Sequence, residues 1–479
     1  MVLLCTWALP GLASAATGTG ELCAELRHPR PEAYQPTREE QAFLEVLQHD
    51  TFRFFWEASG GSGLTPDHTP GSGVSSVAAI GFALSSYLVG VERGYVTREE
   101  AAARTLQTVR RLWEAPQGPA AEGVAGYRGF FYHFLDGALG VRADGSELST
   151  IDTALLMAGV LSSEAYFDRD DEVEASIRRV CDELYRRVDW SWAYSPRQRP
   201  LLSMGWSPER GFFDSDWRGY NEGMILYLLA LGSPTHPIDP EAWDAWTRSY
   251  RWESRYGEPH VAFGPLFGHQ YSHIWVDFRG IQDPYMRSKG SDYFLNSERA
   301  TLANRAYCIA NPGRWEGYGD LLWGLTACDG PFRGQAPLAA AKPFHAYWAR
   351  GAGAEDDPLD DGTLAPTAVG GSVPFAPEVA IHTLVNMRAR FGDRLYGRYG
   401  FKDAFNLSYS EKPGGPEGWF DDRYLAIDQG PILLMIENYR TGFLWELLKK
   451  SAYLTGGLRQ AGFTGGWLSS FLAAKDTVH

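Results

Sequence analysis

The sequence predicts an all-α protein built as an (α/α)6 barrel, in which about six inner helices stand inside about six outer ones. Two observations lead to this prediction. Charged amphipathic segments alternate along the chain with segments that are apolar on every side, and patterns typical of strands are sparse. A helix with one charged face suits an outer ring beside water, whereas a helix covered on both sides must be apolar all round.

The alternation is regular in the first half of the chain. Thr37 and Thr97 are candidate N-caps of two amphipathic helices, because a threonine hydroxyl can accept a hydrogen bond from a free backbone N–H of the first turn. Gly232 and Pro234 provide stop signals for the last apolar helix of this half. Taken in pairs, amphipathic then apolar, the expected helices are 37–58 and 74–94, 97–113 and 149–161, and 170–188 and 221–232.

The second half of the chain continues the pattern less regularly. Long connections rich in glycine and proline interrupt the helices, and connections of this length are usually functional or disordered. The connection at 115–147 is rich in aromatic residues and is expected to build the wall of a site, whereas the acidic connection at 351–375 is expected to be mobile. A third such connection covers 59–73, and the expected helices of this half are 239–250, 269–278, 291–310, 319–328, 376–392 and 428–450.

The N-terminus indicates export. Residues 1–16 are a predicted signal peptide, because an apolar run precedes Ala13-Ser14-Ala15, a small-x-small cleavage pattern, although the usual positive residues are missing. The run is too short to span a bilayer. We expect an irregular segment at 17–36 and one barrel domain at 37–479, in a monomeric protein that is periplasmic or secreted.

The cysteines give little support for a metal centre. Cys23, Cys181, Cys308 and Cys328 would remain in the exported chain, and none of them stands in a CxxC spacing, so no zinc site is predicted. In an exported protein one disulfide among these four is possible, and the sequence does not say which.

Composition narrows the class of ligand. The net charge of −15 is spread along the chain and disfavours nucleic acid and anionic membrane surfaces as partners. The 17 Trp, 24 Tyr and 25 Phe suit a cleft that stacks on a neutral polysaccharide or oligosaccharide, although a large core also uses such residues. No nucleophile elbow, HExxH, phosphate-binding loop or dinucleotide-binding fingerprint is present, which excludes serine hydrolases, zinc proteases, NTPases and simple dinucleotide enzymes. We expect no cofactor.

Carboxylates stand at the expected starts of three apolar helices: Asp152, Glu222 and Asp428, with Glu147 just upstream of the first. If the inner helices run in the same direction, these acids meet at one mouth of the barrel. Glycoside hydrolysis needs such a set, because one carboxylic acid protonates the leaving oxygen while a carboxylate activates water or attacks the sugar.

Each carboxylate also has a purely structural interpretation. Ser149 and Asp152 resemble a capping box, and acids are common in first helical turns because the helix dipole favours them. Asp428 precedes a glycine and Pro431, so it could be only an N-cap. The dipole should keep Asp428 ionised, which suits a base, whereas Glu222 on the most apolar helix is the candidate acid.

Several segments together resemble a known family. "DTFRFFWEASGGSGLTPDHT", "GFFYHFLD", "STIDTALLMAGVL", "FFDSDWRGYNEGMILYLLALGSP" and "AIDQGPILLMIENYRTGFLW" are similar to the glycoamylase-like domain, typified by bacterial endo-β-1,2-glucanases of glycoside hydrolase family 144. The resemblance runs from about residue 40 to about residue 455. It implies an (α/α)6 barrel without metal that hydrolyses β-1,2-glucan to sophoro-oligosaccharides with inversion, with Glu222 as acid and Asp428 as base.

Two alternatives remain at this stage. The same domain occurs in cyclic β-1,2-glucan synthases as a retaining transglycosylase, and a barrel of this kind could also be a glucan-binding protein without catalysis. Glu378 is expected to be a first-turn acid with no chemistry, and the spacing of His269 and His273 is not assigned to a metal. The residues expected to bind substrate are Tyr127, His133, Glu147, Trp217, Arg218, Tyr220, His273 and Trp315.

Overall fold

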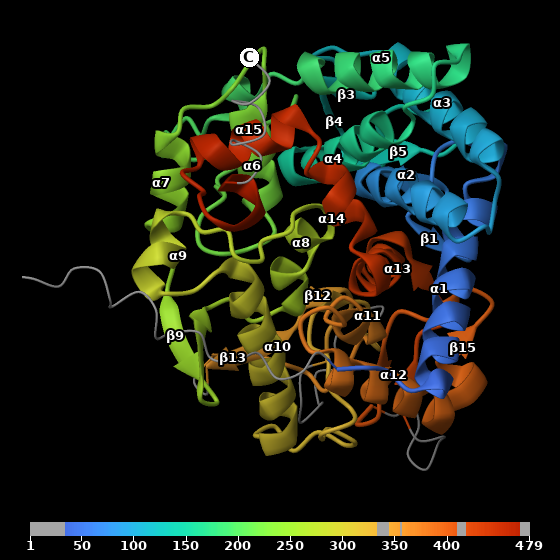
Figure 1. Cartoon of the computed structure of the whole chain (residues 1–479), viewed down its shortest axis with the longest axis vertical. Coiled ribbons are helices and arrows are strands. Elements are labelled where there is room, and N and C mark those ends of the chain that lie inside the picture. The colour runs from blue at the N-terminus through green and yellow to red at the C-terminus, as the bar shows by residue number, and fades with distance from the viewer. Residues whose placement is uncertain (1–33, 333–343, 355–356, 410–417, 470–479) are drawn as a thin grey trace, which may run out of the picture.

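The computed structural model describes residues 34–332, 344–354, 357–409 and 418–469 (Figure 1). Helices carry most of the ordered secondary structure, and the strands are short. The helical class predicted from the sequence is therefore confirmed. The predicted signal peptide at 1–16 and nearly all of the irregular segment at 17–36 lie outside the described residues. None of the described helices is both long enough and apolar enough to cross a membrane.

Apolar helices form the inside of the molecule. Helix α2 contacts α4 and α13, α6 contacts α4 and α8, and α13 contacts α8 and α11. The Gln270 side-chain amide, at the start of α8, donates to the Ala368 carbonyl of α11 over 2.7 Å. This hydrogen bond connects α8 with α11, the last two neighbouring inner helices. The inner helices are α2 (Val77–Glu92), α4 (Thr150–Tyr166), α6 (Met224–Gly232), α8 (Tyr271–Trp275), α11 (Pro366–Gly370) and α13 (Ala426–Thr441).

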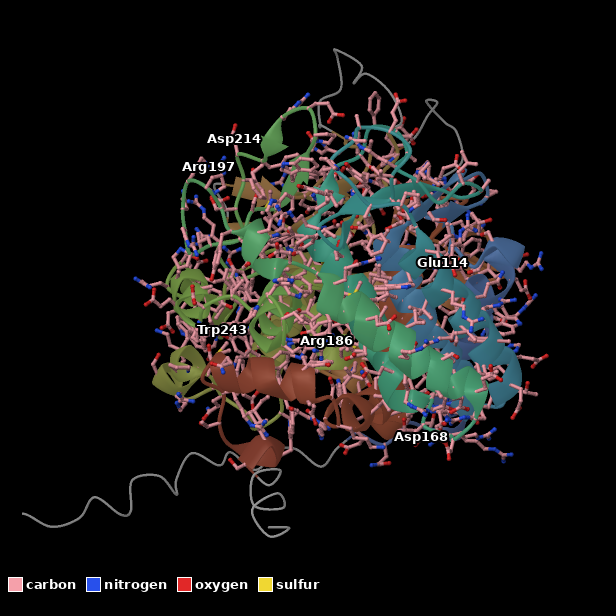
Figure 2. The ribbon with its side chains drawn as sticks, turned by 90° about the horizontal axis from the view of Figure 1, so that it is seen from above. Glu114, Asp168, Arg186, Arg197, Asp214 and Trp243 are labelled. Carbon is pink, nitrogen blue, oxygen red and sulfur yellow. The ribbon has the colours of Figure 1, made fainter. Side chains whose placement is uncertain are left out.

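Amphipathic helices cover this inner set. Helix α1 packs on α2 and α13, α3 packs on α5 and α2, and α15 packs on α6. Figure 2 shows the side chains over this outer surface, with Glu114 of α3 and Arg186 of α5 labelled. The outer helices are α1 (Arg38–Ala58), α3 (Arg98–Glu114), α5 (Glu172–Arg187), α7 (Glu241–Thr247), α9 (Pro284–Lys289), α10 (Tyr293–Ala310), α12 (Pro377–Phe391), α14 (Phe443–Leu448) and α15 (Ala452–Gln460).

Helix starts agree with the expected caps. The Thr37 hydroxyl accepts from the backbone N–H of Glu40, and the Glu40 carboxylate accepts from the backbone N–H of Thr37, which completes a capping box. Thr97 and Glu100 repeat this arrangement at α3. Both N-caps predicted from the sequence are confirmed.

Three expectations about helices were wrong. Helix α6 begins at Met224, so Glu222 lies in the turn before the helix. Residues 319–328 form a bridge and part of a short strand, because Gly324 takes a φ of 128° that a right-handed helix cannot contain. The connection at 351–375 contains the buried helix α11, which Pro366 starts with its fixed φ.

Short antiparallel strands lead into the inner helices. Strand β2 (Val74–Ser76) ends where α2 begins, β6 (Leu148–Ser149) ends where α4 begins, and β19 (Tyr424–Leu425) ends where α13 begins. Their partners β5 (Phe134–Asp136), β7 (Gly205–Ser207) and β1 (His68–Thr69) come from the connecting loops. The pairs therefore fix those loops around the N-terminal ends of the inner helices.

The remaining strands are also short pairs. Strand β8 (Gly211–Phe212) extends the β6–β7 pair, and β11 pairs with β12. Their bounds are β3 (Gly126–Tyr127), β4 (Phe130–Phe131), β9 (Trp252–Arg255), β10 (Glu258–Val261), β11 (Ala327–Cys328), β12 (Trp348–Ala349), β13 (Gly351–Ala354), β14 (Asp357–Leu359), β15 (Tyr396–Gly397), β16 (Gly400–Phe401), β17 (Phe405–Asn406) and β18 (Trp419–Phe420). The cysteines at 181, 308 and 328 are free and buried, and Cys23 lies outside the described residues.

Helices α2 and α4 approach each other through glycines. A Cβ on Gly159 would lie 2.1 Å from the Gly81 carbonyl oxygen, a separation that backbone atoms cannot relieve. We expect Gly159→Ala to lower the free energy of unfolding by about 3 kcal/mol, because overpacking here must separate two backbones. Urea unfolding followed by circular dichroism measures the change.

A matched glycine provides the control for this prediction. Gly456 of α15 has no atom within 4 Å of an added Cβ. Gly456→Ala should leave the protein unchanged or stabilise it by about 0.5–1 kcal/mol, as alanine does in an open helical position. Equal effects of the two substitutions would contradict the close approach of α2 and α4.

Candidate active site

A cavity of about 750 Å³ lies at the N-terminal ends of the inner helices. Loops preceding α2, α4, α6 and α13 contribute to its wall, so residues far apart in the sequence meet there. Its acidic lining residues are Asp67, Glu147, Asp152, Glu222 and Asp329, and its aromatic lining residues are Phe134, Phe213, Trp217, Phe267, Tyr271 and Tyr347. Acids beside apolar rings provide both proton donors and acceptors and flat surfaces for sugar rings.

Glu222 is the acid of this cavity whose environment favours the protonated form. Its backbone carbonyl accepts from the Ser272 hydroxyl, which itself accepts from the Ile225 N–H and so fixes the turn before α6. Burial, and then the nearby negative charge of Asp152, raise the pKa of Glu222 to about 7. A carboxyl group with this pKa still carries its proton in a large fraction of molecules near neutrality.

Asp152 takes part in a helix cap and also lines the cavity. The Ser149 hydroxyl accepts from the Asp152 N–H over 3.2 Å, so Ser149 does cap helix α4. The same hydroxyl donates to Asp152 Oδ2 over 2.5 Å, and His133 Nε2 lies 3.7 Å from that oxygen. The Asp152 carboxylate is thus held in the cavity wall by a cap and a cation together.

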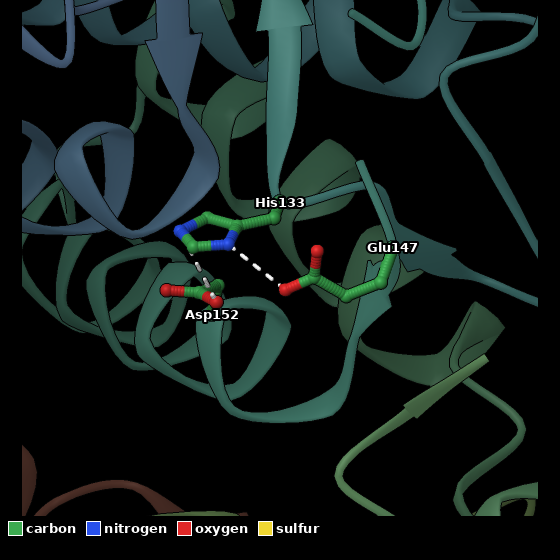
Figure 3. A group of neighbouring side chains, drawn as sticks. All are labelled: His133, Glu147 and Asp152. Atoms are coloured by element: carbon green, nitrogen blue, oxygen red, sulfur yellow. Dashed lines mark hydrogen bonds and ion pairs between the residues drawn. The ribbon is translucent and has the colours of Figure 1, made fainter. Parts of the chain in front are cut away.

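His133 links two of the acids (Figure 3). Its Nδ1 lies 2.9 Å from Glu147 Oε1, and its ring stacks on Phe134 with 3.9 Å between centroids. Burial opposes the imidazolium, but Asp152, Glu147 and Asp67 outweigh burial and raise the pKa of His133 to about 9. Burial would raise the pKa of Glu147, but the hydrogen bond with His133, the charge of His133 and weaker effects together outweigh burial and lower that pKa. Near neutrality the pair is therefore an imidazolium and a carboxylate.

The same three side chains could in principle hold a cation. One ligand atom from each of His133, Glu147 and Asp152 lies within 4.8 Å of the others. Both nitrogens of His133 already face a carboxylate, so ion pairing within the group accounts for its geometry.

Asp428 lies behind the cavity wall. It stands in the first turn of α13, where Leu425 is the N-cap residue, and it is 3% exposed and absent from the cavity lining. Burial, and then the neighbouring Asp403, raise the pKa of Asp428 well above its usual range. The expectation that the helix dipole keeps Asp428 ionised overlooked these two opposing effects, and Asp403 carried no signal in the sequence.

Five residues expected to bind substrate lie outside the cavity lining. Tyr127 packs against Trp192 and Trp206, and the exposed Arg218 is not among the lining residues. The aromatic rings among these five residues pack against other side chains and do not line the cavity. A buried ring and a sugar platform have the same sequence pattern. Tyr220 packs beside Tyr250 and His269, the imidazole of His273 lies 3.0 Å from the Ser297 hydroxyl in the core, and Trp315 hydrogen-bonds with Asn311.

Trp217, His133 and Glu147 do line the cavity, as expected. The Trp217 indole N–H donates to the Thr150 hydroxyl over 2.9 Å, which fixes the ring at the start of α4. Sequence reasoning missed other lining residues because they stand in loops without helical periodicity. These are Asp67, His68, Asp329, Tyr347 and Arg423.

Comparisons with known proteins find relatives along most of the chain. The family described as "Putative glucoamylase" matches residues 214–452. A Bacteroides uniformis protein of known structure, described in the same words, is 34% identical, with 91% of this chain and 100% of that protein covered and a TM-score of 0.77. An endo-β-1,2-glucanase from Chitinophaga pinensis, solved with sophorotriose and glucose, is 30% identical, with 89% and 99% covered and a TM-score of 0.76.

A further relative is named for attack at the end of an oligosaccharide. It is an exo β-1,2-glucooligosaccharide sophorohydrolase (non-reducing end) from Parabacteroides distasonis, 31% identical over 463 residues. The match covers 89% of this chain and 58% of that relative, so the chain spans little more than half of the relative's length.

The helical barrel-type fold and the acid-lined cavity place the protein in the class of helical glycoside hydrolases. Within this class, the chain belongs to the glycoamylase-like family, as the resemblance in its sequence implied.

Proposed function

We propose that the protein is an endo-acting hydrolase of β-1,2-glucan in which Glu222 is the general acid. The observation that carries this proposal is the carboxyl group of Glu222, held on the cavity wall with a pKa of about 7 beside Asp152. A general acid of a glycosidase must keep its proton near the working pH in order to protonate the leaving oxygen. The names of the Chitinophaga and Parabacteroides relatives support β-1,2-glucan as the substrate.

We propose Asp428 as the base, with Asp152 contributing through its charge. Hydrolysis with inversion requires a water molecule on the far side of the sugar ring. The ionised carboxyl group of the base accepts a proton from this water. Asp428 follows Ile427, which lines the cavity, and its charge acts on the lining residues Tyr271 and Tyr347. Exo attack releasing sophorose is the second candidate, because the Parabacteroides relative is named for it.

The helix contacts also support the (α/α)6 description. The inner neighbours α2, α4, α6, α8, α11 and α13 follow one another around a closed path, and outer helices pack against them. This arrangement places the starts of α2, α4 and α13 beside one cavity, which a carboxylate pair drawn from distant segments requires.

Product analysis tests this proposal. The purified chain is incubated with linear β-1,2-glucan, laminarin, carboxymethyl cellulose and starch, and products are followed by chromatography and proton NMR. We expect a ladder of sophoro-oligosaccharides from β-1,2-glucan only, with the α-anomer appearing first. Sophorose as the sole early product would indicate exo attack, and the β-anomer first would indicate retention. Hydrolysis of another glucan, or of none, would overturn the substrate assignment.

A further inference from the structure

A pair of aspartates lies beneath the floor of the cavity. Asp403, in the turn between β16 and β17, is 1% exposed, and Asp428 at the start of α13 is 3% exposed. Each carboxyl group shifts the pKa of the other through a hydrogen-bond interaction between them, which places the two groups side by side. Carboxylates have no hydrogen to donate, so this bond exists only when one of the two groups is protonated.

The remaining contacts of the pair do not replace this proton. Asp403 Oδ2 accepts from the backbone N–H of Asp329 over 2.7 Å. Asp403 Oδ1 and Asp428 Oδ2 are enclosed and have no hydrogen-bond donor within the part of the chain that the structure describes. A buried ionised oxygen without a donor is costly, which favours one shared hydrogen over two carboxylates.

The nearest cations are occupied by other acids. Arg423 is paired with Asp329 and lies 3.8 Å from Asp421, and Arg350 forms its ion pair with Asp361. More negative than positive charge therefore surrounds the pair. Burial raises the pKa of Asp403 to about 6, with the charge of Asp421 adding to the effect. The ionisable residues around the pair include Asp67, Asp329, Asp421, Arg350, Arg423, Cys328, Tyr271 and Tyr347.

We propose that Asp403 and Asp428 hold one proton between them, and that Asp403 is the positioning residue that fixes the charge and orientation of Asp428. This proposal rests on the base function proposed above for Asp428. In the reaction, water gives hydroxide to the anomeric carbon and its proton to the ionised carboxylate of Asp428, while Asp403 holds the shared proton. Glu222 gives its proton to the departing glycosidic oxygen. After product release the pair returns one proton to solvent and Glu222 takes one up, so one water is consumed per bond.

The pH profile of Asp403→Asn tests the positioning role. The wild-type value of kcat/KM should fall on the acid side near pH 6, where the pair takes up its second proton. In the variant, Asp428 accepts a hydrogen bond from an amide and has no carboxyl neighbour, so we expect this acid limb to move down by about one pH unit or more. An acid limb that stays in place would overturn the proposal. The control is Asp422→Asn at an exposed neighbouring position, which should not move the limb.

Thermal unfolding tests the shared proton without any substrate. A raised pKa in the folded protein means that the folded state keeps a proton that the unfolded chain releases, so Tm should fall between pH 4 and pH 7. The double variant Asp403→Asn/Asp428→Asn removes the part of this fall in Tm that the pair causes. If the pair shares one proton, either single substitution should already remove most of that part.

The outcomes separate this inference from the proposed function. Two independent carboxyl groups would each account for about half of the effect on Tm, and the proposal would then be wrong. A cation in place of the proton would also overturn it, and would appear as loss of activity in EDTA and recovery with Ca²⁺. If β-1,2-glucan is not hydrolysed but one substitution removes most of the Tm effect, the pair stands and only the base function fails.

Discussion

Glu222→Gln is expected to lower kcat/KM on β-1,2-glucan by about 10³-fold, because removal of a general acid costs about 10² to 10⁴ in rate. The amide keeps the size of the side chain and has no acidic proton, so the glycosidic oxygen must leave as an alkoxide. Steady-state release of reducing ends from wild type and variant measures the loss. The matched control is Glu378→Gln in the exposed first turn of α12, which should keep full activity.

A second substrate distinguishes a lost acid from a damaged site. An aryl sophoroside with a dinitrophenolate leaving group needs little protonation, so Glu222→Gln should hydrolyse it within about 10-fold of wild type. Wild-type activity on the polymer should also decline as the pH rises through about 7, where Glu222 loses its proton. Equal losses on both substrates would show that Glu222 supports the structure and does not act as the acid.

Arg350→Met is expected to lower the free energy of unfolding by about 3–5 kcal/mol, the usual cost of removing one partner of a buried ion pair. Arg350 and Asp361 are fully buried, and Arg350 Nε donates to Asp361 Oδ1 over 2.6 Å. The same guanidinium donates to the carbonyls of Cys328 and Ala346, so it connects the two segments that form the β11–β12 pair beside the cavity. The substitution leaves the Asp361 carboxylate buried without its cation. Chemical denaturation measures the resulting loss in the free energy of unfolding.

Two further variants show whether the loss of stability in Arg350→Met comes from the unpaired buried charge. The double variant Arg350→Met/Asp361→Leu should recover part of the stability, because no unpaired charge then remains inside. Arg398→Met breaks an exposed ion pair with Glu57 and should cost no more than about 1 kcal/mol. A cost of similar size for Arg350→Met would mean that the buried ion pair does not anchor the β11–β12 pair.

Much of the fold could be predicted from the sequence because the burial of a helix determines which of its positions are apolar, and this pattern can be read along the chain. The apolar faces of α2 and α4 and the charged faces of α1 and α3 identified inner and outer helices correctly. The caps at Thr37 and Thr97 are short-range hydrogen bonds and were equally predictable. Helix α11 was missed because five buried residues are too few to show a helical period.

By itself, the sequence determined the helical class, the alternation of exposed and buried helices, and the presence of acids near the starts of α4, α6 and α13. These properties depend on neighbours within a few turns. Only the tertiary structure decided which acids share an environment: His133 between Glu147 and Asp152, and Asp403 against Asp428. The physical reason is that a pKa depends on burial and on charges a few ångströms away, which the fold brings from distant segments.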